Sequence, residues 1–258
     1  MLKKITLLRD KVSDWESYPF SIPVVRHFDS LRLRSRVCFF AGENGTGKST
    51  LLEAIAAHYG FGREGGTRNF VNDTTESNHS IDPLVRALRL SFDKRTGAGF
   101  FLRAESFFNT VSYMDALDKE PSEGPRLSTF YGGRSLHTRS HGETFFTVLE
   151  LKCQRDGLFL LDEPEAALSP QRQLAFLVLL HDVLRKRRDA QFIISSHSPV
   201  LLGYPEAQIV SFDNGILQET QYEEASPTQI VRRFVNDRDS FVQELFRDTP
   251  MLFDGKPD

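Results

Sequence analysis

The sequence predicts an α/β fold built on a mainly parallel β-sheet. In the second half of the chain, short apolar runs at 158–161, 191–195 and 209–212 alternate with helical patterns, as expected of a parallel sheet. In the first half, a glycine-rich segment at 42–50 joins an apolar run to a helical pattern. The chain has 258 residues, 40% of them hydrophobic, which suits one large domain with a sizeable core.

The individual elements follow from periodicity and from turn residues. Besides the three runs above, we predict strands at 3–9, 31–41, 85–92 and 99–103. Helices are predicted at 49–59, 105–117, 143–154, 171–187 and 228–246, and loops at 60–82 and 118–125. A single domain is therefore expected over 1–247, with a helical lobe at about 105–155 and a flexible tail at 248–258.

Composition narrows the class of protein. The net charge of −3 provides no global basic field for nucleic acid. Cys38 and Cys153 have no metal-site spacing, so we expect reduced thiols in a cytoplasmic protein. The sequence shows no signal peptide and no apolar run near the roughly 18 residues of a membrane span, so no transmembrane segment is predicted.

The segment 42–50 reads Gly-Glu-Asn-Gly-Thr-Gly-Lys-Ser-Thr and fits the phosphate-loop pattern G-x-x-x-x-G-K-[ST]. Glycines let backbone N–H groups curl around phosphate oxygens, and the start of the following helix adds its positive dipole end. Lys48 can reach the β- and γ-phosphates, and Ser49 can ligate Mg²⁺. The predicted nucleotide-binding residues here are Gly42, Asn44, Gly45, Thr46, Gly47, Lys48, Ser49 and Thr50.

Two later strands end in chemically active side chains. The run 158–161 is followed by Asp162 and Glu163, which would stand at the sheet edge where open α/β sheets bind ligands. Asp162 is predicted to hold Mg²⁺ through water, and Glu163 to orient or deprotonate an attacking water. His197 follows the next strand, where its imidazole could donate to the γ-phosphate or position water.

The tetrapeptide Ser140-His141-Gly142-Glu143 opens a predicted helix. Ser140 and Glu143 form a capping-box pattern. The same helix start, preceded by two glycines, offers N–H groups and a dipole to an anion. The two interpretations are compatible.

The order of these motifs along the chain resembles that of the ATP-binding-cassette (ABC) ATPases. Residues 162–170, Asp-Glu-Pro-Glu-Ala-Ala-Leu-Ser-Pro, are similar to the soluble branch that includes RecF, the SMC proteins and small stand-alone prokaryotic ATPases. The resemblance spans about 20–213 and implies a P-loop NTPase fold of ABC type, with an antiparallel β portion beside the parallel core and a helical signature-motif lobe. Transporter cassettes usually have Glu-Pro-Thr and Ser-Gly-Gly-Gln instead.

The resemblance also implies roles. Two subunits would sandwich two ATP molecules, with Ser140 and Gly142 of the signature contacting the γ-phosphate held by the other subunit. Glu143, which ends the signature, is a further predicted nucleotide-binding residue. Glu163 would be the general base and His197 the switch histidine. Where the family usually has a glutamine on the Mg²⁺, this chain offers Glu105. An aromatic ring commonly stacks on adenine; Tyr18 and Phe20 are the candidates, with core packing as the alternative for each.

The sequence thus predicts a soluble Mg²⁺-dependent ATPase that forms a homodimer around ATP and couples closure to an unknown protein partner, in DNA repair or phage defence. The alternative is the nucleotide-binding subunit of an ABC transporter, against which the Glu-Pro-Glu sequence argues. A nucleic-acid partner is suggested only by the shared face of Arg32, Arg34 and Arg36 and by the basic segment 185–188. A solvated face is the favoured interpretation of the first, and cations that suit the dipole at a helix end are the favoured interpretation of the second.

Overall fold

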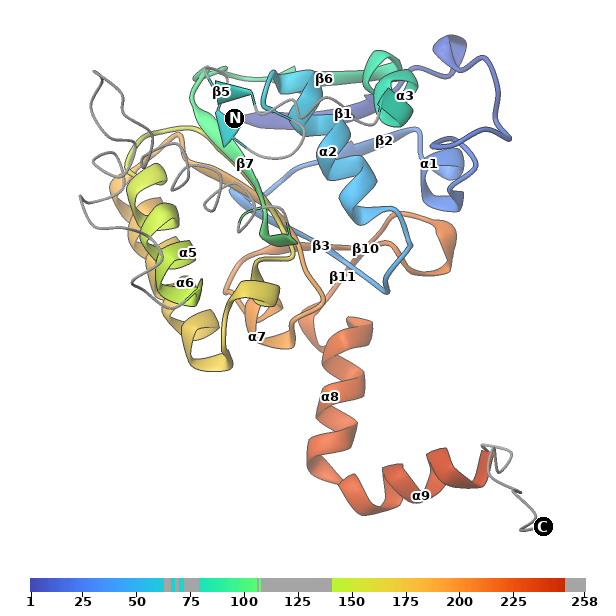
Figure 1. The fold of residues 1–258 in the computed structure, drawn as a ribbon. Helices are drawn as coiled ribbons and strands as arrows, with labels where there is room; N and C mark the ends of the chain where they lie inside the picture. Colours follow the sequence, from blue (N-terminus) through green and yellow to red (C-terminus); the bar gives the residue numbers. More distant parts are fainter. Residues whose placement is uncertain (63–65, 68–69, 72–78, 106, 108–140, 249–258) are drawn as a thin grey trace, which may run out of the picture.

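The structure is a computed structural model that describes residues 1–62, 66–67, 70–71, 79–105, 107 and 141–248. Two sheets form its framework (Figure 1). The larger has eight strands in the order β11-β10-β3-β9-β8-β7-β4-β5. Its strands are β3 Val37–Ala41, β4 Gly66–Thr67, β5 Phe70–Val71, β7 Gly99–Arg103, β8 Leu158–Asp162, β9 Gln191–Ser195, β10 Gln208–Ser211 and β11 Gln218–Thr220.

The centre of the large sheet is parallel, as predicted. Strands β10, β3, β9, β8 and β7 are parallel neighbours, while β11 and β4 pair antiparallel at the two ends of this block. Every residue of β3, β8 and β9 is buried, which explains their continuous apolar runs. The parallel core and its antiparallel portion confirm the predicted fold class.

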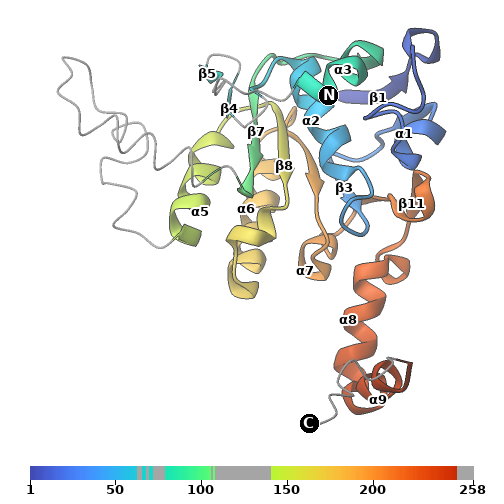
Figure 2. The ribbon, with the colours of Figure 1, turned by 45° about the vertical axis from the view of Figure 1, so that its right-hand side comes forward.

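Both faces of the large sheet are covered. Successive residues of β3 point to opposite cores, with Cys38 and Phe40 on one side and Val37, Phe39 and Ala41 on the other. Helix α2 (Lys48–Tyr59) packs in the first core, and helices α5 (His141–Lys152) and α6 (Pro170–Lys186) pack in the second. Figure 2 shows α2 on one side of the sheet and α5 and α6 on the other.

A smaller antiparallel sheet, of order β2-β1-β6, shares the core of α2. It consists of β1 Leu2–Leu7, β2 Ser30–Arg32 and β6 Leu88–Phe92. The predicted single strand at 31–41 is therefore wrong: it is β2 in this sheet and β3 in the large one. Between them, Arg36 donates to the Leu184 and Arg187 carbonyls at 2.9 and 3.0 Å, and Arg34 pairs with Glu219 at 3.3 Å, so no continuous arginine face forms.

Three other predicted elements also differ. The predicted loop at 60–82 contains the short strands β4 and β5. The segment 85–92 begins in helix α3 (Asp82–Ala87), since a proline at the helix start favours the first turn, and only then becomes β6. The predicted helix 228–246 is two helices, α8 (Ser226–Asn236) and α9 (Arg238–Asp248), separated by the non-helical Asp237 with φ −146° and ψ 64°. Figure 1 shows α8 and α9 extending away from the sheets.

The remaining elements are short: α1 Pro23–His27, α7 Pro199–Leu202 and the 3₁₀ helices η1 Arg9–Lys11, η2 His79–Ile81, η5 Pro164–Ala167, η6 Asp213–Gly215 and η7 Tyr222–Glu224. Most of the predicted helix 105–117, apart from residues 105 and 107, and most of the predicted lobe and tail lie outside the described residues. Cys38 and Cys153 are free and buried. Within the described ranges, no helix combines the length and apolar character needed to cross a membrane.

Candidate nucleotide-binding site

Several of the predicted site residues meet at the carboxyl edge of three neighbouring strands. The phosphate-loop segment follows β3, Asp162 is the last residue of β8, and His197 lies two residues beyond β9. The register sets Asp162 beside Ser195, and Ser195 beside Phe40. Because parallel strands end at the same edge, Lys48, Asp162, Glu163 and His197 come to one place, as the sequence predicted.

The loop between β3 and α2 requires glycine where it touches its neighbours. Gly42 has φ +139°, and a Cβ there would lie 2.9 Å from Asp213 Oδ1, which also accepts a hydrogen bond from the Glu43 N–H at 3.2 Å. Gly47 has φ +99°, and a Cβ there would lie 2.9 Å from Ile22 Cγ2. These left-handed conformations at close contacts fix the loop ahead of α2. All eight predicted phosphate-binding residues lie in this loop or in the first turn of α2.

Lys48 begins α2 and folds back over the loop. Its Nζ donates to the carbonyl oxygens of Gly42 and Glu43, both at 2.8 Å. Desolvation lowers the pKa of Lys48, while the nearby carboxylates of Glu163 and Asp162 act in the opposite direction. The two contacting carbonyls are neutral, so these hydrogen bonds do not neutralise an ammonium charge.

Ser49 and Asp162 form a pair that fits a magnesium ion. Ser49 Oγ donates to Asp162 Oδ1 at 2.9 Å, and the Asp162 side chain is buried. A hydroxyl and a carboxylate are hard oxygen ligands, and Mg²⁺ usually completes its shell with water and phosphate oxygens. Glu105 is exposed, and no contact of its side chain with Ser49 or Asp162 is found among the described residues, so its role stays a prediction.

Arg103 is a site residue to which the sequence reasoning assigned no role. It ends β7 opposite Asp162 in the register, and its Nε donates to Asp162 Oδ2 at 3.1 Å. Its Nη2 donates to Glu53 Oε2 of α2 at 3.0 Å. The available signal was its place at the end of a strand, the same criterion that singled out Asp162.

Glu163 adopts a left-handed conformation, with φ 48° and ψ 52°. This conformation is unfavourable for a residue with a side chain and is often found at functional sites. The Glu163 N–H donates to the Ser195 carbonyl at 3.0 Å, which ties the turn after β8 to the end of β9. Glu163 is thereby fixed between Asp162 and the segment that bears His197.

Glu165 joins the turn after β8 to His197. Its Oε1 accepts hydrogen bonds from Ser196 Oγ at 2.8 Å and from the His197 N–H at 2.7 Å, and lies 3.5 Å from His197 Nδ1. Burial raises the pKa of Glu165. Its Oε2 is buried with no hydrogen-bond partner in the described part of the chain. The sequence reasoning used Glu165 only as a family marker, and nothing local in the sequence indicated its burial.

The two aromatic candidates separate clearly. Tyr18 is 49% exposed, and its hydroxyl lies 3.3 Å from Thr50 Oγ1 in the first turn of α2. Phe20 is 2% exposed and packs in the core, where its ring contacts Trp15 with the centroids 5.8 Å apart. Phe20 is therefore not available for stacking on adenine, which corrects that prediction and leaves Tyr18 as the candidate.

The predicted signature segment is described in part. Ser140 lies outside the described residues, and Gly142 lies in the first turn of α5. The Glu143 side chain is about half exposed and accepts a hydrogen bond from Arg172 Nη2 of α6 at 3.1 Å. The helix thus presents Glu143 at the protein surface.

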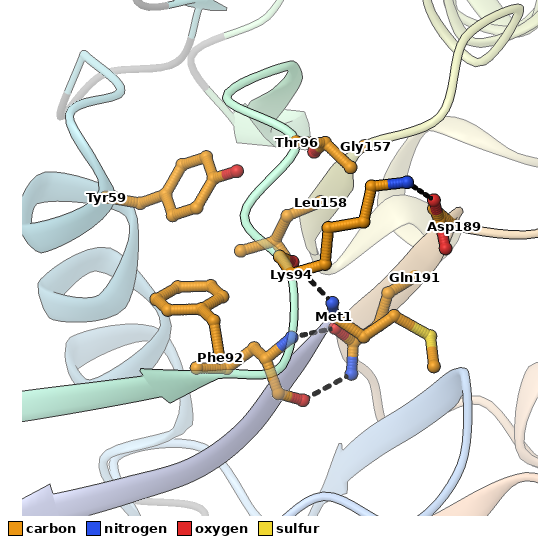
Figure 3. Close-up of a pocket in the computed structure, with 10 residues that line it drawn as sticks. Met1, Tyr59, Phe92, Lys94, Thr96, Gly157, Leu158, Asp189 and Gln191 are labelled. Atoms are coloured by element: carbon orange, nitrogen blue, oxygen red, sulfur yellow. Dashed lines mark hydrogen bonds and ion pairs between the residues drawn. The ribbon is translucent and has the colours of Figure 1, made fainter.

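A small pocket lies at the opposite edge of the sheet (Figure 3). Its lining includes Leu158 and Gln191, the first residues of β8 and β9. The Met1 amine donates to the Lys94 carbonyl at 2.6 Å, and the Lys94 side chain pairs with Asp189. No predicted site residue lines this pocket. We interpret it as a packing gap at the contact between the two sheets.

The strand order, the loop after β3 and the acidic end of β8 together define an α/β P-loop NTPase fold. Over residues 143–203, less than a quarter of the chain, the sequence matches the family model described as "AAA domain, putative AbiEii toxin, Type IV TA system". No curated protein matches the chain.

Three solved structures illustrate the likeness of fold. An ATP-binding cassette of an ABC transporter is 15% identical with a TM-score of 0.48, and the match covers 95% of this chain and 98% of that one. The cbiO1 protein of Clostridium perfringens, part of an ABC transporter complex, is 17% identical with a TM-score of 0.45, covering 84% and 90%. The SMC head domain of Thermotoga maritima is 16% identical with a TM-score of 0.42, covering 85% and 98%. At these scores the likeness supports no inference about function.

Proposed function

We propose that this protein binds ATP with Mg²⁺ and hydrolyses it. The observation that best supports this is the meeting of a glycine-rich loop, a lysine and a serine–aspartate pair at one sheet edge, with Ser49 Oγ 2.9 Å from Asp162 Oδ1. A P-loop with this arrangement binds the phosphates of a nucleotide through backbone N–H groups and its lysine. ATP is favoured over GTP because the chain has no Asn-Lys-x-Asp guanine motif.

Each residue has a distinct task in this proposal. Lys48 exchanges its two carbonyl contacts for the β- and γ-phosphates. Ser49 and Asp162 would hold the magnesium ion, which supplies charge neutralisation to the phosphates when it is bound. Glu163 orients or deprotonates the attacking water, and His197 donates to the γ-phosphate. Tyr18 stacks on the base beside Thr50.

The test is a comparison of two charge-removing variants in binding and phosphate-release assays. Lys48→Ala should lose ATP binding, and with it hydrolysis. Glu163→Gln should keep ATP binding and lose about 100- to 10,000-fold in turnover, the usual contribution of a general base. Glu223→Gln, the same change at an exposed position of η7, is the matched control and should behave as wild type. Wild-type levels of hydrolysis in Glu163→Gln would refute the role of Glu163.

We further propose that the active form is a homodimer around two ATP molecules, in which α5 of one copy completes the site of the other. The exposed Glu143 at the start of α5 supports a surface role for this helix. A site shared between copies requires association, so the hydrolysis rate per chain should rise with protein concentration and then level off. A rate per chain that does not depend on concentration would count against the shared site.

We propose a cytoplasmic ATPase whose closure acts on a protein partner in phage defence or DNA repair. Residues 143–203 match a family model whose description names a toxin–antitoxin system, and this match favours the defence role. Pull-down with Glu163→Gln in ATP and Mg²⁺, with Lys48→Ala as the control, should retain the partner only in the nucleotide-trapped form. Equal recovery by both variants would exclude coupling of partner binding to nucleotide. Stimulation of hydrolysis by duplex DNA, weakened by salt, would instead indicate direct DNA binding.

A further inference from the structure

Arg103 holds the same carboxylate that is assigned to the magnesium ion. Its guanidinium bridges Asp162 Oδ2 at 3.1 Å and Glu53 Oε2 at 3.0 Å. The side chains are 26%, 4% and 16% exposed for Arg103, Asp162 and Glu53, so this charge cluster is largely shielded from water. Asp162 Oδ1 is meanwhile occupied by the Ser49 hydroxyl. Both oxygens of Asp162 are therefore engaged in this structure.

A buried carboxylate is costly without a positive partner, and Arg103 supplies one here. A divalent cation beside Asp162 and Ser49 would add two positive charges close to the guanidinium, and like charges at such separations repel. Arg103 and the cation therefore compete for Asp162. Glu53 gives the guanidinium a second anchor, one turn after Ser49 on α2, to which it can stay attached when it leaves Asp162.

We propose that Arg103 is a built-in counter-ion for Asp162 that Mg²⁺ must displace, so that it sets how strongly nucleotide binding depends on the metal. The proposal rests on nucleotide binding at the P-loop, the function proposed above. Arg103 is here a positioning residue, since it acts on the site through Asp162 and Glu53.

The experiment measures binding of a fluorescent ADP analogue in EDTA and in saturating Mg²⁺. The ratio of the two dissociation constants is the coupling between metal and nucleotide. In Arg103→Gln this coupling should increase about three- to tenfold, because the competing charge is gone. Arg103→Lys keeps the charge and should stay near wild type. Arg89→Gln, on the exposed face of β6, is the matched control and should not change the coupling.

Whether the coupling between metal and nucleotide rises or falls in Arg103→Gln tests the proposal. If Arg103 instead holds Asp162 in place for the metal, the coupling in Arg103→Gln falls, and an unchanged coupling shows that Arg103 does not act on the metal site; either result overturns the proposal. Binding of the analogue in EDTA, together with circular dichroism, checks that each variant is folded with an intact loop. A wild-type protein that binds no nucleotide under either condition refutes the proposed function itself, which is a different outcome.

Discussion

Replacing Glu165 tests the link between the turn after β8 and the end of β9. Glu165→Ala removes the acceptor of the Ser196 Oγ–H and His197 N–H hydrogen bonds. Ser196 is buried, and leaving its donor without a partner costs about 1–3 kcal/mol, whereas the His197 N–H bond is exposed and water can replace it. The substitution also removes a buried carboxylate whose Oε2 has no hydrogen-bond partner in the described residues. Burying that oxygen destabilises the wild type, so its removal offsets part of the loss. We therefore expect Glu165→Ala to lower the free energy of unfolding by about 1–2 kcal/mol.

Glu165→Gln separates the hydrogen bonds from the charge. Its amide oxygen can accept from both donors, so the loss should be only about 0–1 kcal/mol at neutral pH. Burial raises the pKa of Glu165 in the folded protein, so the unfolded chain loses this proton at a lower pH than the folded protein does. The raised pKa of Glu165 therefore contributes to the free energy of unfolding. This contribution is at its maximum below the ordinary pKa of 4.5, and it is lost as the pH rises through the folded-state pKa.

The stability of Glu165→Gln relative to wild type should therefore improve as the pH rises from 4.5 toward neutrality, since glutamine does not titrate. Urea unfolding followed by the fluorescence of Trp15, the one tryptophan of the chain, gives the free energy of unfolding at each pH. Equal losses for Ala and Gln would show that the two hydrogen bonds do not stabilise this turn. A difference between Gln and wild type that does not vary with pH would show that Glu165 has no raised pKa.

Three further outcomes can be measured. Tyr18→Ala should weaken ATP binding about 5- to 100-fold with little change in stability, whereas Phe20→Ala should lower the free energy of unfolding by about 3–5 kcal/mol; the reverse pattern would exchange their roles. Gly47→Ala should destabilise by about 1–3 kcal/mol, because its Cβ meets Ile22 at a left-handed φ, and unchanged urea unfolding would contradict the contact. Arg36→Ala should cost about 1–2 kcal/mol through the lost bonds to the end of α6, without changing any affinity for DNA, which a gel-shift assay would check.

The sequence was sufficient to predict the parallel core and which of several residues would lie together at its carboxyl edge. Fully buried strands read as continuous apolar runs, and β8 and β9 showed this pattern. The phosphate loop is local, so its residues are recognisable from spacing alone. Asp162 and His197 follow such runs, and the shared edge of parallel strands is enough to bring them together.

Contacts between distant segments explain what the sequence did not indicate. The alternation at 31–36 runs directly into β3, and the chain between β2 and β3 is held by contacts with distant residues, among them those of Arg36 with the Leu184 and Arg187 carbonyls, 148 and 151 residues away. Arg103 reaches partners 50 and 59 residues away, and Glu165 partners 31 and 32 residues away. Such pairings depend on how the strands are ordered, which no local pattern encodes.

Light scattering of Glu163→Gln with and without ATP and Mg²⁺ tests most directly whether a nucleotide held by one chain is completed by a second. We expect a mass of two chains with ATP and Mg²⁺, and of one chain when ATP is omitted or when Lys48→Ala is added to the variant. A mass of one chain at saturating ATP and Mg²⁺ would contradict the shared site.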